Sequence, residues 1–256
     1  MSVSHLNIWV ITLENALERQ QRIERIFQHH NLDFNFLYGV DGRLGEHELL
    51  KKFNPHAFLR KHGRYSVPGE AGCYASHYLA WQKAVELDEP VIVLEDDCVL
   101  SDDASEAFQQ AHRLVCEQGF GFIRLERDKV KKPAKLVCEE SGFEVFRFYK
   151  IQQSMTGYII SPEVAKAFIA ASERFVLPVD YFIRHMYLHK QPIYVLRPSP
   201  VWADDANIAT TMDNRRARKA PLIFKFTRHA FRMKSMLLNG IWNIRFLLRD
   251  IQRDKV

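Results

Sequence analysis

The sequence VIVLEDD at residues 91–97 is the feature that most restricts the fold of this chain. Four consecutive apolar residues lead directly into Glu95, Asp96 and Asp97. An uninterrupted apolar strand is typical of a sheet that helices cover on both faces, as in α/β proteins with a largely parallel sheet. We therefore expect an α/β fold in which one buried strand ends in three carboxylates.

Strand-like and helix-like patterns alternate along the rest of the chain. Residues 7–13 have the composition of a strand, residues 14–31 place apolar side chains at helical spacing, and residues 34–40 form a second strand pattern before a turn. Further helices are expected over 69–88, 104–118 and 162–172 and from near Asp180, and a last strand over 192–196. No linker or internal repeat interrupts this alternation, which predicts one domain built from βαβ units.

Charge divides the chain at Asp213. The whole sequence has a net charge of +5, yet 12 Lys and Arg and only two Asp follow Asp213. Residues 214–256 therefore carry a net charge of +10, and residues 1–213 carry −5. We expect residues 1–213 to form an acidic folded domain and residues 214–256 to form a separate basic tail.

The N-terminal segment is expected to be a strand and not a signal peptide, because it has no basic start and no small-residue cleavage site. No run approaches the roughly 18 apolar residues of a membrane span. The four cysteines form no CxxC pair, which disfavours a zinc knuckle, and we expect buried free thiols in a reducing compartment. These features predict a cytoplasmic protein.

The three carboxylates predict a ligand site. In open α/β sheets, ligands bind at the carboxyl ends of the strands. Adjacent carboxylates repel one another, so Glu95, Asp96 and Asp97 should face a cation or water. A hard divalent cation such as Mn²⁺ or Mg²⁺, bridging to a diphosphate, would neutralise them. The alternative is a solvated turn before the next helix, a role that clearly suits Asp102 and Asp103.

Several motifs, in order, resemble glycosyltransferase family 25, the bacterial lipopolysaccharide and lipooligosaccharide sugar transferases related to the collagen galactosyltransferases. The most specific pair is PGEAGCYASHYLAWQKAV at 68–85 followed by VIVLEDDCVL at 91–100. The others are WVITLENALERQQRIERIF at 9–27, YGVDG at 38–42, TGYIIS at 156–161 and LPVDYF at 177–182. Together these motifs span most of the acidic domain.

The resemblance implies a GT-A type catalytic domain with a Rossmann-like, mostly parallel sheet flanked by helices. It also implies an inverting transfer from a nucleotide sugar, with UDP-galactose the expected donor. Asp97 is then the preferred metal ligand beside Glu95, and Asp96 contacts the donor, although the two aspartates could exchange roles. The other expected donor contacts are Val10, Thr12, Leu13, Arg19, Arg22, Asp41, Gly69, Glu70, Gly72, Ser76 and His77.

General chemistry supports some of these contacts and leaves alternatives open. Gly69 and Gly72 allow a ligand to approach the backbone closely, and a helix N-terminus attracts phosphate. Arg19 and Arg22 can pair with phosphate, or they can form the exposed face of an amphipathic helix. His77 can contact the donor, or it can be a hydrogen-bonded structural histidine.

An inverting transfer needs a base that takes the proton from the acceptor hydroxyl. Asp180 is the first candidate, with helix N-capping as its alternative role, and Glu126 is the second candidate. The expected acceptor contacts are Thr156, Gly157 and Tyr158, although a tyrosine here is often part of the core. Asp204 and Asp205 could instead contact the metal or the acceptor.

In the basic tail, aromatic and aliphatic side chains recur among Lys and Arg at intervals of three and four residues. This pattern predicts a basic amphipathic helix or pair of helices, suited to an anionic membrane surface. The alternatives are a helix packed on the acidic domain, a dimer contact, and nucleic-acid binding, which no recognised motif supports. We expect a peripheral protein on the inner face of the bacterial inner membrane. The sequence does not predict its oligomeric state.

The sequence therefore favours an enzyme that moves a sugar from a UDP-sugar to a lipooligosaccharide or lipopolysaccharide acceptor. The alternative is a non-catalytic homologue that acts as a scaffold in the same pathway. A nucleotidyltransferase or phosphatase is disfavoured, because the chain has no glycine-rich phosphate loop with a lysine.

Overall fold

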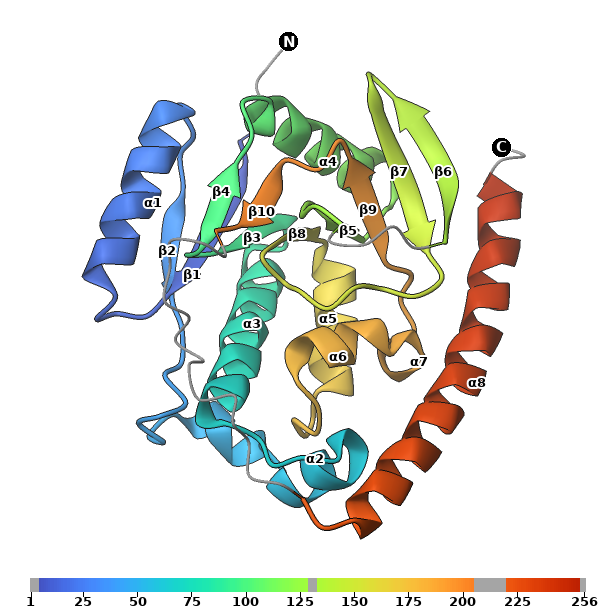
Figure 1. Ribbon diagram of the computed structural model, residues 1–256. Helices are drawn as coiled ribbons and strands as arrows, with labels where there is room; N and C mark the ends of the chain where they lie inside the picture. The colour runs from blue at the N-terminus through green and yellow to red at the C-terminus, as the bar shows by residue number, and fades with distance from the viewer. Residues whose placement is uncertain (1–4, 129–132, 205–219, 254–256) are drawn as a thin grey trace.

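A large sheet forms the centre of the molecule, as the computed structural model shows; it describes residues 5–128, 133–204 and 220–253. Eight strands lie in the order β2-β1-β3-β8-β5-β9-β7-β6. Six of them run in one direction, and β8 and β7 run in the other. Helices cover both faces (Figure 1). The predicted α/β class, with a mostly parallel sheet flanked by helices, is confirmed.

The N-terminal βαβ unit is formed by β1 (Asn7–Thr12), α1 (Leu17–His29) and β2 (Asn35–Tyr38), with β1 and β2 parallel as expected. β3 (Val91–Glu95) lies parallel on the other side of β1, so that Ile11 pairs with Glu95. The carboxyl ends of β1 and β3 therefore lie side by side. This arrangement brings the end of the first strand next to the acidic motif.

Side chains of β3 alternate between two hydrophobic clusters. Ile92 and Leu94 belong to the cluster under α1 and α4 (Ala104–Gln118). Val91 and Val93 belong to the cluster under α3 (Pro68–Leu87) and α5 (Pro162–Ala171). All four side chains are at most 1% exposed. Burial of such side chains contributes about 1.5–3 kcal/mol each, and it holds both helical layers on the sheet.

The middle of the sheet contains one of the two strands that run in the opposite direction. β8 (Gly157–Ile160) lies antiparallel between β3 and β5 (Phe122–Arg124). β9 (Tyr194–Arg197) then lies parallel to β5. Through β8, the segment just before Gly157 lies beside the end of β3, where Glu95 N donates to Thr156 O at 3.0 Å.

The far edge of the sheet is an antiparallel hairpin of β6 (Ala134–Glu140) and β7 (Phe143–Phe148), with β7 paired to β9. A separate two-stranded sheet pairs β4 (Cys98–Leu100) with β10 (Val201–Ala203). This small sheet follows the acidic motif directly and fixes the chain that leaves it.

Local signals set the helix boundaries. Ser161 is the N-cap of α5, where its side chain accepts a hydrogen bond from Val164 N, and Pro162 takes the first helical position. The short helices are η1 (Glu48–Lys52), α2 (Pro55–His62), α6 (Val179–Arg184) and α7 (Met186–His189). Of these, only the helix near Asp180 is expected from the sequence pattern.

The described part of the basic tail forms one long helix, α8 (Ile223–Arg253), and not a pair of helices. It lies along the body from α2 to the hairpin edge (Figure 1), where Thr227 Oγ1 donates to Arg60 O at 2.8 Å and Asp250 pairs with Arg147. The predicted boundary at Asp213 lies outside the described residues. Among the described helices, none combines the length and apolar composition needed to cross a membrane.

All four cysteines are free, as expected. Cys98 is buried, and Cys73 and Cys138 are half-buried, but Cys116 is exposed. The expectation of four buried thiols is therefore wrong for Cys116, which lies near the end of the amphipathic helix α4.

Candidate functional site

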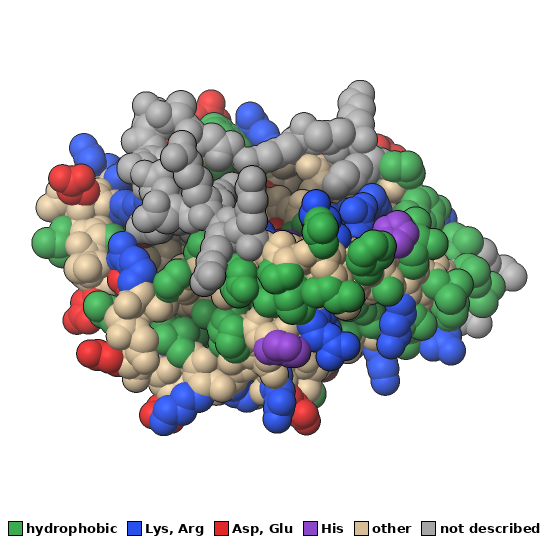
Figure 2. Space-filling view, turned by 60° about the horizontal axis from the view of Figure 1, so that its bottom comes forward, with side chains coloured by type: hydrophobic (Ala, Val, Ile, Leu, Met, Phe, Trp, Pro, Cys, Tyr) green, Lys and Arg blue, Asp and Glu red, His purple; other side chains and the backbone are tan. Residues whose placement is uncertain are grey.

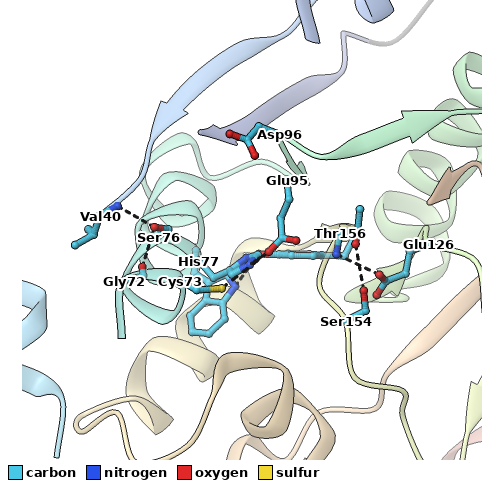
Figure 3. A network of polar contacts seen from close by, with 12 residues as sticks. Val40, Gly72, Cys73, Ser76, His77, Glu95, Asp96, Glu126, Ser154 and Thr156 are labelled. Atoms are coloured by element: carbon cyan, nitrogen blue, oxygen red, sulfur yellow. Dashed lines mark hydrogen bonds and ion pairs between the residues drawn. The ribbon is translucent and has the colours of Figure 1, made fainter. Parts of the chain in front are cut away.

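A cleft of about 730 Å³ opens at the carboxyl ends of β1 and β3. Its lining comes from these strand ends, the turn after β2, the first half of α3, residues 153–156 and the start of α6. Figure 3 shows Glu95 and Asp96 of the acidic motif, with the side chains of α3 on one side and Thr156 on the other. Ligands of open α/β sheets bind at this edge, so the cleft is the candidate active site.

Asp96 is held by the first βα unit. Thr12 Oγ1 donates to one carboxylate oxygen at 2.7 Å, and Arg19 Nη1 donates to the other at 2.7 Å. Arg22 supports the same turn by donating to Cys98 O at 2.9 Å, and it pairs with Asp204 at 3.3 Å. Thr12 and Arg19 therefore line the cleft while they fix Asp96, and Arg22 acts from outside the lining.

Asp97 differs from its neighbour. Its Oδ1 is buried and accepts a hydrogen bond from none of the described residues. Burial, followed by the charges of Glu95 and Asp96, raises the pKa of Asp97 from 3.8 to about 7. Asp204 N donates to the main-chain oxygen of Asp97 at 2.9 Å, whereas Asp205 lies outside the described residues. A crowded carboxylate with a spare oxygen is suited to a cation.

Two glycines fasten α3 to the turn after β2. A Cβ on Gly72 would lie 2.5 Å from Gly42 N and from Val40 O, and a Cβ on Gly42 would lie 2.0 Å from Pro68 O. Because these neighbours are backbone atoms, a side chain at either position would force helix and turn apart. Ser76 Oγ completes the junction by donating to Gly72 O and accepting from Val40 N, both at 2.8 Å (Figure 3).

Glu70 joins the start of α3 to an arginine of the cleft. Its Oε2 accepts from Val67 N at 3.0 Å and from Arg64 Nη1 at 2.8 Å. A second arginine, Arg43, donates through Nε to Asp41 at 2.8 Å, and this hydrogen bond lowers the pKa of Asp41. Both guanidinium groups belong to the lining, so the cleft holds positive charge as well as the acidic motif.

A chain of hydrogen bonds leads from the core to Glu95. Trp81 Nε1 donates to Tyr158 Oη at 3.1 Å, Tyr158 Oη lies 3.0 Å from His77 Nδ1, and His77 Nε2 lies 3.2 Å from Glu95 Oε1. In the tautomer that donates from Nε2–H to the Glu95 carboxylate, Nδ1 accepts the hydroxyl proton of Tyr158, whose oxygen accepts from Trp81. His77 is therefore a buried structural histidine that also orients the acidic motif.

Cys73 lies one turn before His77, with its Sγ 4.0 Å from the same Glu95 oxygen. Ligand atoms of Cys73, His77 and Glu95 all lie within 4.8 Å of one another, which makes them a second candidate metal cluster (Figure 3). Burial raises the pKa of the Cys73 thiol well above its usual value. Since thiolates and not thiols bind metals, Glu95 and Asp97 are the better ligand pair.

Asp180 enters the cleft from the first turn of α6. The N-cap position belongs to Pro178, and Asp180 Oδ1 accepts from Tyr181 N at 2.9 Å. Burial raises the pKa of Asp180 from 3.8 to about 6, and the charges of Glu70 and Glu95 act in the same direction. A carboxyl group in a cleft with a pKa near neutrality has the properties of a general base.

Glu126, the second predicted base, has a different environment. It forms a buried ion pair with Arg124, and its other oxygen accepts from Thr156 N at 3.2 Å. Thr156 also shares a hydrogen bond of 3.1 Å with Ser154. Glu126 is not part of the cleft lining. It holds in place the loop that contains the lining residues Ser154 and Thr156.

Most of the predicted site residues line the cleft: Thr12, Leu13, Arg19, Asp41, Gly69, Glu70, Ser76, His77, Glu95, Asp96, Asp97, Thr156 and Asp180. The lining does not include Val10, Arg22, Gly72, Glu126, Gly157 and Tyr158. Val10 and Tyr158 belong to the core, and a Cβ on Gly157 would meet Leu94 and Val201. The structure thus gives these residues supporting positions behind the cleft wall.

Sequence reasoning did not single out several lining residues: Arg43, His62, Arg64, Gln153, Ser154 and Tyr181. Arg43 follows Asp41 by two residues, so its place in the cleft could have been predicted from the turn at Asp41 and Gly42. No motif marks His62 and Arg64, which reach the cleft from α2 and the loop after it. Their position depends on the tertiary packing of α2.

Comparison with known proteins agrees with the motifs. A family model described as "Glycosyltransferase family 25 (LPS biosynthesis protein)" matches residues 5–183. The lipooligosaccharide biosynthesis protein lic2B of Haemophilus influenzae is 25% identical over 97% of this chain and 95% of its own length. A glycosyltransferase 25 family member of Aedes aegypti is 31% identical, and procollagen galactosyltransferase 2 of Homo sapiens 25%, each over 73% of this chain and 31% of its own.

A solved structure of UDP-glucose pyrophosphorylase with UDP-glucose covers 74% of this chain and 89% of its own, at 12% identity and a TM-score of 0.35. The fold is therefore described from this chain alone.

Proposed function

The chain belongs to glycosyltransferase family 25, and on this premise we propose that the cleft transfers a sugar from a nucleotide-sugar donor to a glycan acceptor. The full proposal is an inverting transfer of galactose from UDP-galactose to a lipooligosaccharide or lipopolysaccharide acceptor, with a divalent cation at the diphosphate.

The observation that carries the proposal is the presence of two unlike carboxylates in one cleft of about 730 Å³. Asp97 has a buried oxygen to which none of the described residues donates, and it lies beside Glu95, whereas Asp180 stands apart on α6. Sugar transfer requires positive charge at the leaving diphosphate and a base at the acceptor hydroxyl. Two carboxylates in different environments can take these two roles.

The residues of the acidic motif fit a divalent metal. Asp97 and Glu95 would hold Mn²⁺ or Mg²⁺, because hard cations prefer carboxylate oxygens and Asp97 Oδ1 is unsatisfied among the described residues. When bound, such a cation stabilises charge on the leaving diphosphate. Arg43 and Arg64 supply further positive charge for the donor, and Asp96 contacts its sugar or ribose while Thr12 and Arg19 fix it.

Asp180 takes the proton in this proposal. As the acceptor oxygen forms its bond to the anomeric carbon, the hydroxyl proton moves to the carboxylate. The bond from the anomeric carbon to the diphosphate oxygen breaks, and its electron pair leaves with the diphosphate. Attack opposite the leaving group inverts the anomeric centre. We assign Asp180 rather than Glu126, because both oxygens of Glu126 already accept hydrogen bonds.

The donor and acceptor classes come from the relatives. The relative that matches nearly the full length of this chain is named for lipooligosaccharide biosynthesis, which supports a lipid-linked saccharide acceptor. The procollagen galactosyltransferases support galactose as the sugar. Thr156 and Ser154, on the loop that Glu126 holds, are the acceptor contacts in this proposal.

Donor turnover tests the proposal. Purified protein is incubated with a lipooligosaccharide acceptor and one of UDP-galactose, UDP-glucose and UDP-N-acetylglucosamine, with and without Mn²⁺, and release of UDP is measured. We expect metal-dependent turnover that is fastest with UDP-galactose and is lost in Asp97→Ala. NMR of the product then gives the anomeric configuration. Absence of metal-dependent turnover with every donor, or full turnover in Asp97→Ala, contradicts the proposal and favours the non-catalytic scaffold.

A further inference from the structure

One face of α8 holds the helix on the body. The side chains of this body face recur every three or four residues: Thr227, Phe231, Ser235, Asn239, Trp242, Phe246 and Asp250. They make specific contacts, such as Asn239 Nδ2 to Arg184 O at 3.2 Å and Arg147 Nε to Asp250 at 2.6 Å. The body therefore already satisfies this face, and the opposite face is left outside.

The outward face of α8 is apolar. Phe226 is 73% exposed, Leu237 68% and Ile244 61%. Met233, Ile241 and Leu248 are also exposed and complete a stripe with helical spacing. At 1.5 Å per residue, the stripe is about 33 Å long. Figure 2 shows hydrophobic side chains gathered along this part of the surface. An apolar surface of that length marks an interaction site.

Lys and Arg border this stripe. The exposed cations of α8 are Lys225, Arg228, Arg232, Lys234, Arg245 and Arg249. At 100° per residue, Lys234 and Arg245 lie next to one edge of the stripe, whereas Lys225 and Arg232 lie further round the helix, toward the body face. The only acidic residue of α8 is Asp250, which is buried against Arg147. The helix thus presents an apolar stripe with positive charge along one edge and further exposed cations between the stripe and the body.

We propose that the outward face of α8 docks on an anionic lipid surface. The apolar stripe would lie at the boundary of headgroups and acyl chains, and the bordering cations would lie at the anionic headgroups. A second copy of this chain fits the face less well, because two copies of α8 would bring their rows of Lys and Arg together without acids between them.

Docking on this face would bring the cleft near the lipid. Thr227 on α8 donates to Arg60 O of α2, and Lys61 Nζ lies 5.5 Å from the centre of the Phe231 ring. His62, the last residue of α2, lines the cleft. An acceptor anchored in the same lipid layer would therefore enter from the α2 side. This step rests on the proposed function, whereas the docking itself does not.

Vesicle binding of the full chain tests the proposal without donor or acceptor. Sedimentation is measured with phosphatidylcholine vesicles and with vesicles that also contain phosphatidylglycerol. The apolar variant is F226S/L237S/I244S. The matched control, L17S/L44S/L136S, removes three exposed leucines from other surfaces, where they are 63%, 68% and 42% exposed. Circular dichroism and thermal unfolding check the fold of every variant.

We expect the wild type and the control to sediment with anionic vesicles much more than with neutral ones, and the apolar variant to bind at least about tenfold more weakly. A second variant, K234Q/R245Q, keeps the stripe and should weaken binding about fivefold for each charge removed. Unchanged binding of both folded variants overturns the proposal. It is also overturned if the wild type ignores anionic vesicles but is a dimer by light scattering that F226S/L237S/I244S dissociates.

Discussion

Acidic side chains lie in two kinds of environment in this molecule. Three of them pair with arginines: Glu126 with Arg124 two residues away, and Asp128 with Arg197 and Asp250 with Arg147 across distant segments. In the cleft, no Lys or Arg of the described residues lies within 4.0 Å of the carboxylates of Asp97 and Asp180, and burial raises the pKa of both. Paired carboxylates therefore support the fold, whereas unpaired ones oppose it and are suited to chemistry.

The largest expected effect is on the paired group. Asp250→Ala leaves Arg147, which is 0% exposed, as a buried charge without its partner. We expect the free energy of unfolding to fall by about 3–5 kcal/mol, measured by urea denaturation. The double variant R147M/D250A removes both charges and should recover part of the loss. A loss below about 1 kcal/mol in Asp250→Ala would contradict the distinction between paired and unpaired carboxylates, because this pair would then not support the fold.

Asp180→Asn should separate activity from stability. The rate should fall about 10²-fold, close to 3 kcal/mol, because the base is lost. The wild-type rate should rise with pH through about 6, since the base must be ionised. Because burial raises the pKa of Asp180 in the folded state, ionisation opposes folding as pH rises from about 4 to about 6.

The same substitution should therefore stabilise the protein above pH 6, by at most about 3 kcal/mol, and should give no gain below about pH 4. Thermal unfolding of both proteins at pH 4 and pH 8 measures this difference. A variant that loses stability at pH 8 would place Asp180 with the paired carboxylates.

Metal binding sharpens the comparison at Asp97. Mn²⁺ at 100 times its dissociation constant should stabilise the wild type by about 2.7 kcal/mol, seen as a higher melting temperature. Asp97→Asn should abolish this shift, whereas Cys73→Ser should keep it. The reverse result would move the metal to the cluster of Cys73, His77 and Glu95.

The smallest expected effect concerns the hydrogen bonds behind Glu95. Tyr158→Phe removes the hydroxyl between Trp81 and His77, which should cost about 1–2 kcal/mol of stability and slow turnover several-fold. Tyr74→Phe is the matched control, since Tyr74 Oη bonds to Ser172 at 2.8 Å and Tyr74 does not line the cleft. It should cost similar stability and leave turnover unchanged. Equal turnover in both variants would show that this chain of hydrogen bonds only supports the fold.

The sequence predicts the elements whose pattern is local. VIVLEDD identifies a buried strand with carboxylates at its end, and the structure confirms both this strand and its parallel neighbour β1. Ser161 and Pro162 mark the start of α5 by cap chemistry alone. These elements are predictable because their signals are periodicity and turn residues within a few positions.

The sequence does not predict partners across long separations. Thr12 binds Asp96 across 84 positions and Arg147 binds Asp250 across 103, and neither pairing leaves a local signal. The pair Arg124 and Glu126 could have been foreseen, because side chains two residues apart in an extended segment point to the same side. For α8, the pattern predicts an amphipathic helix, but both faces carry apolar side chains, and only packing shows which one is covered.

The contacts of α8 have a mechanical consequence. Hydrogen bonds and an ion pair join it to the body near its start, its middle and its end, through Thr227, Asn239 and Asp250. A helix joined to the body at three points does not move independently of it. If it lies on a bilayer, the height of the cleft above the lipid is fixed. Only sugars at a set distance from the lipid anchor would then reach the cleft.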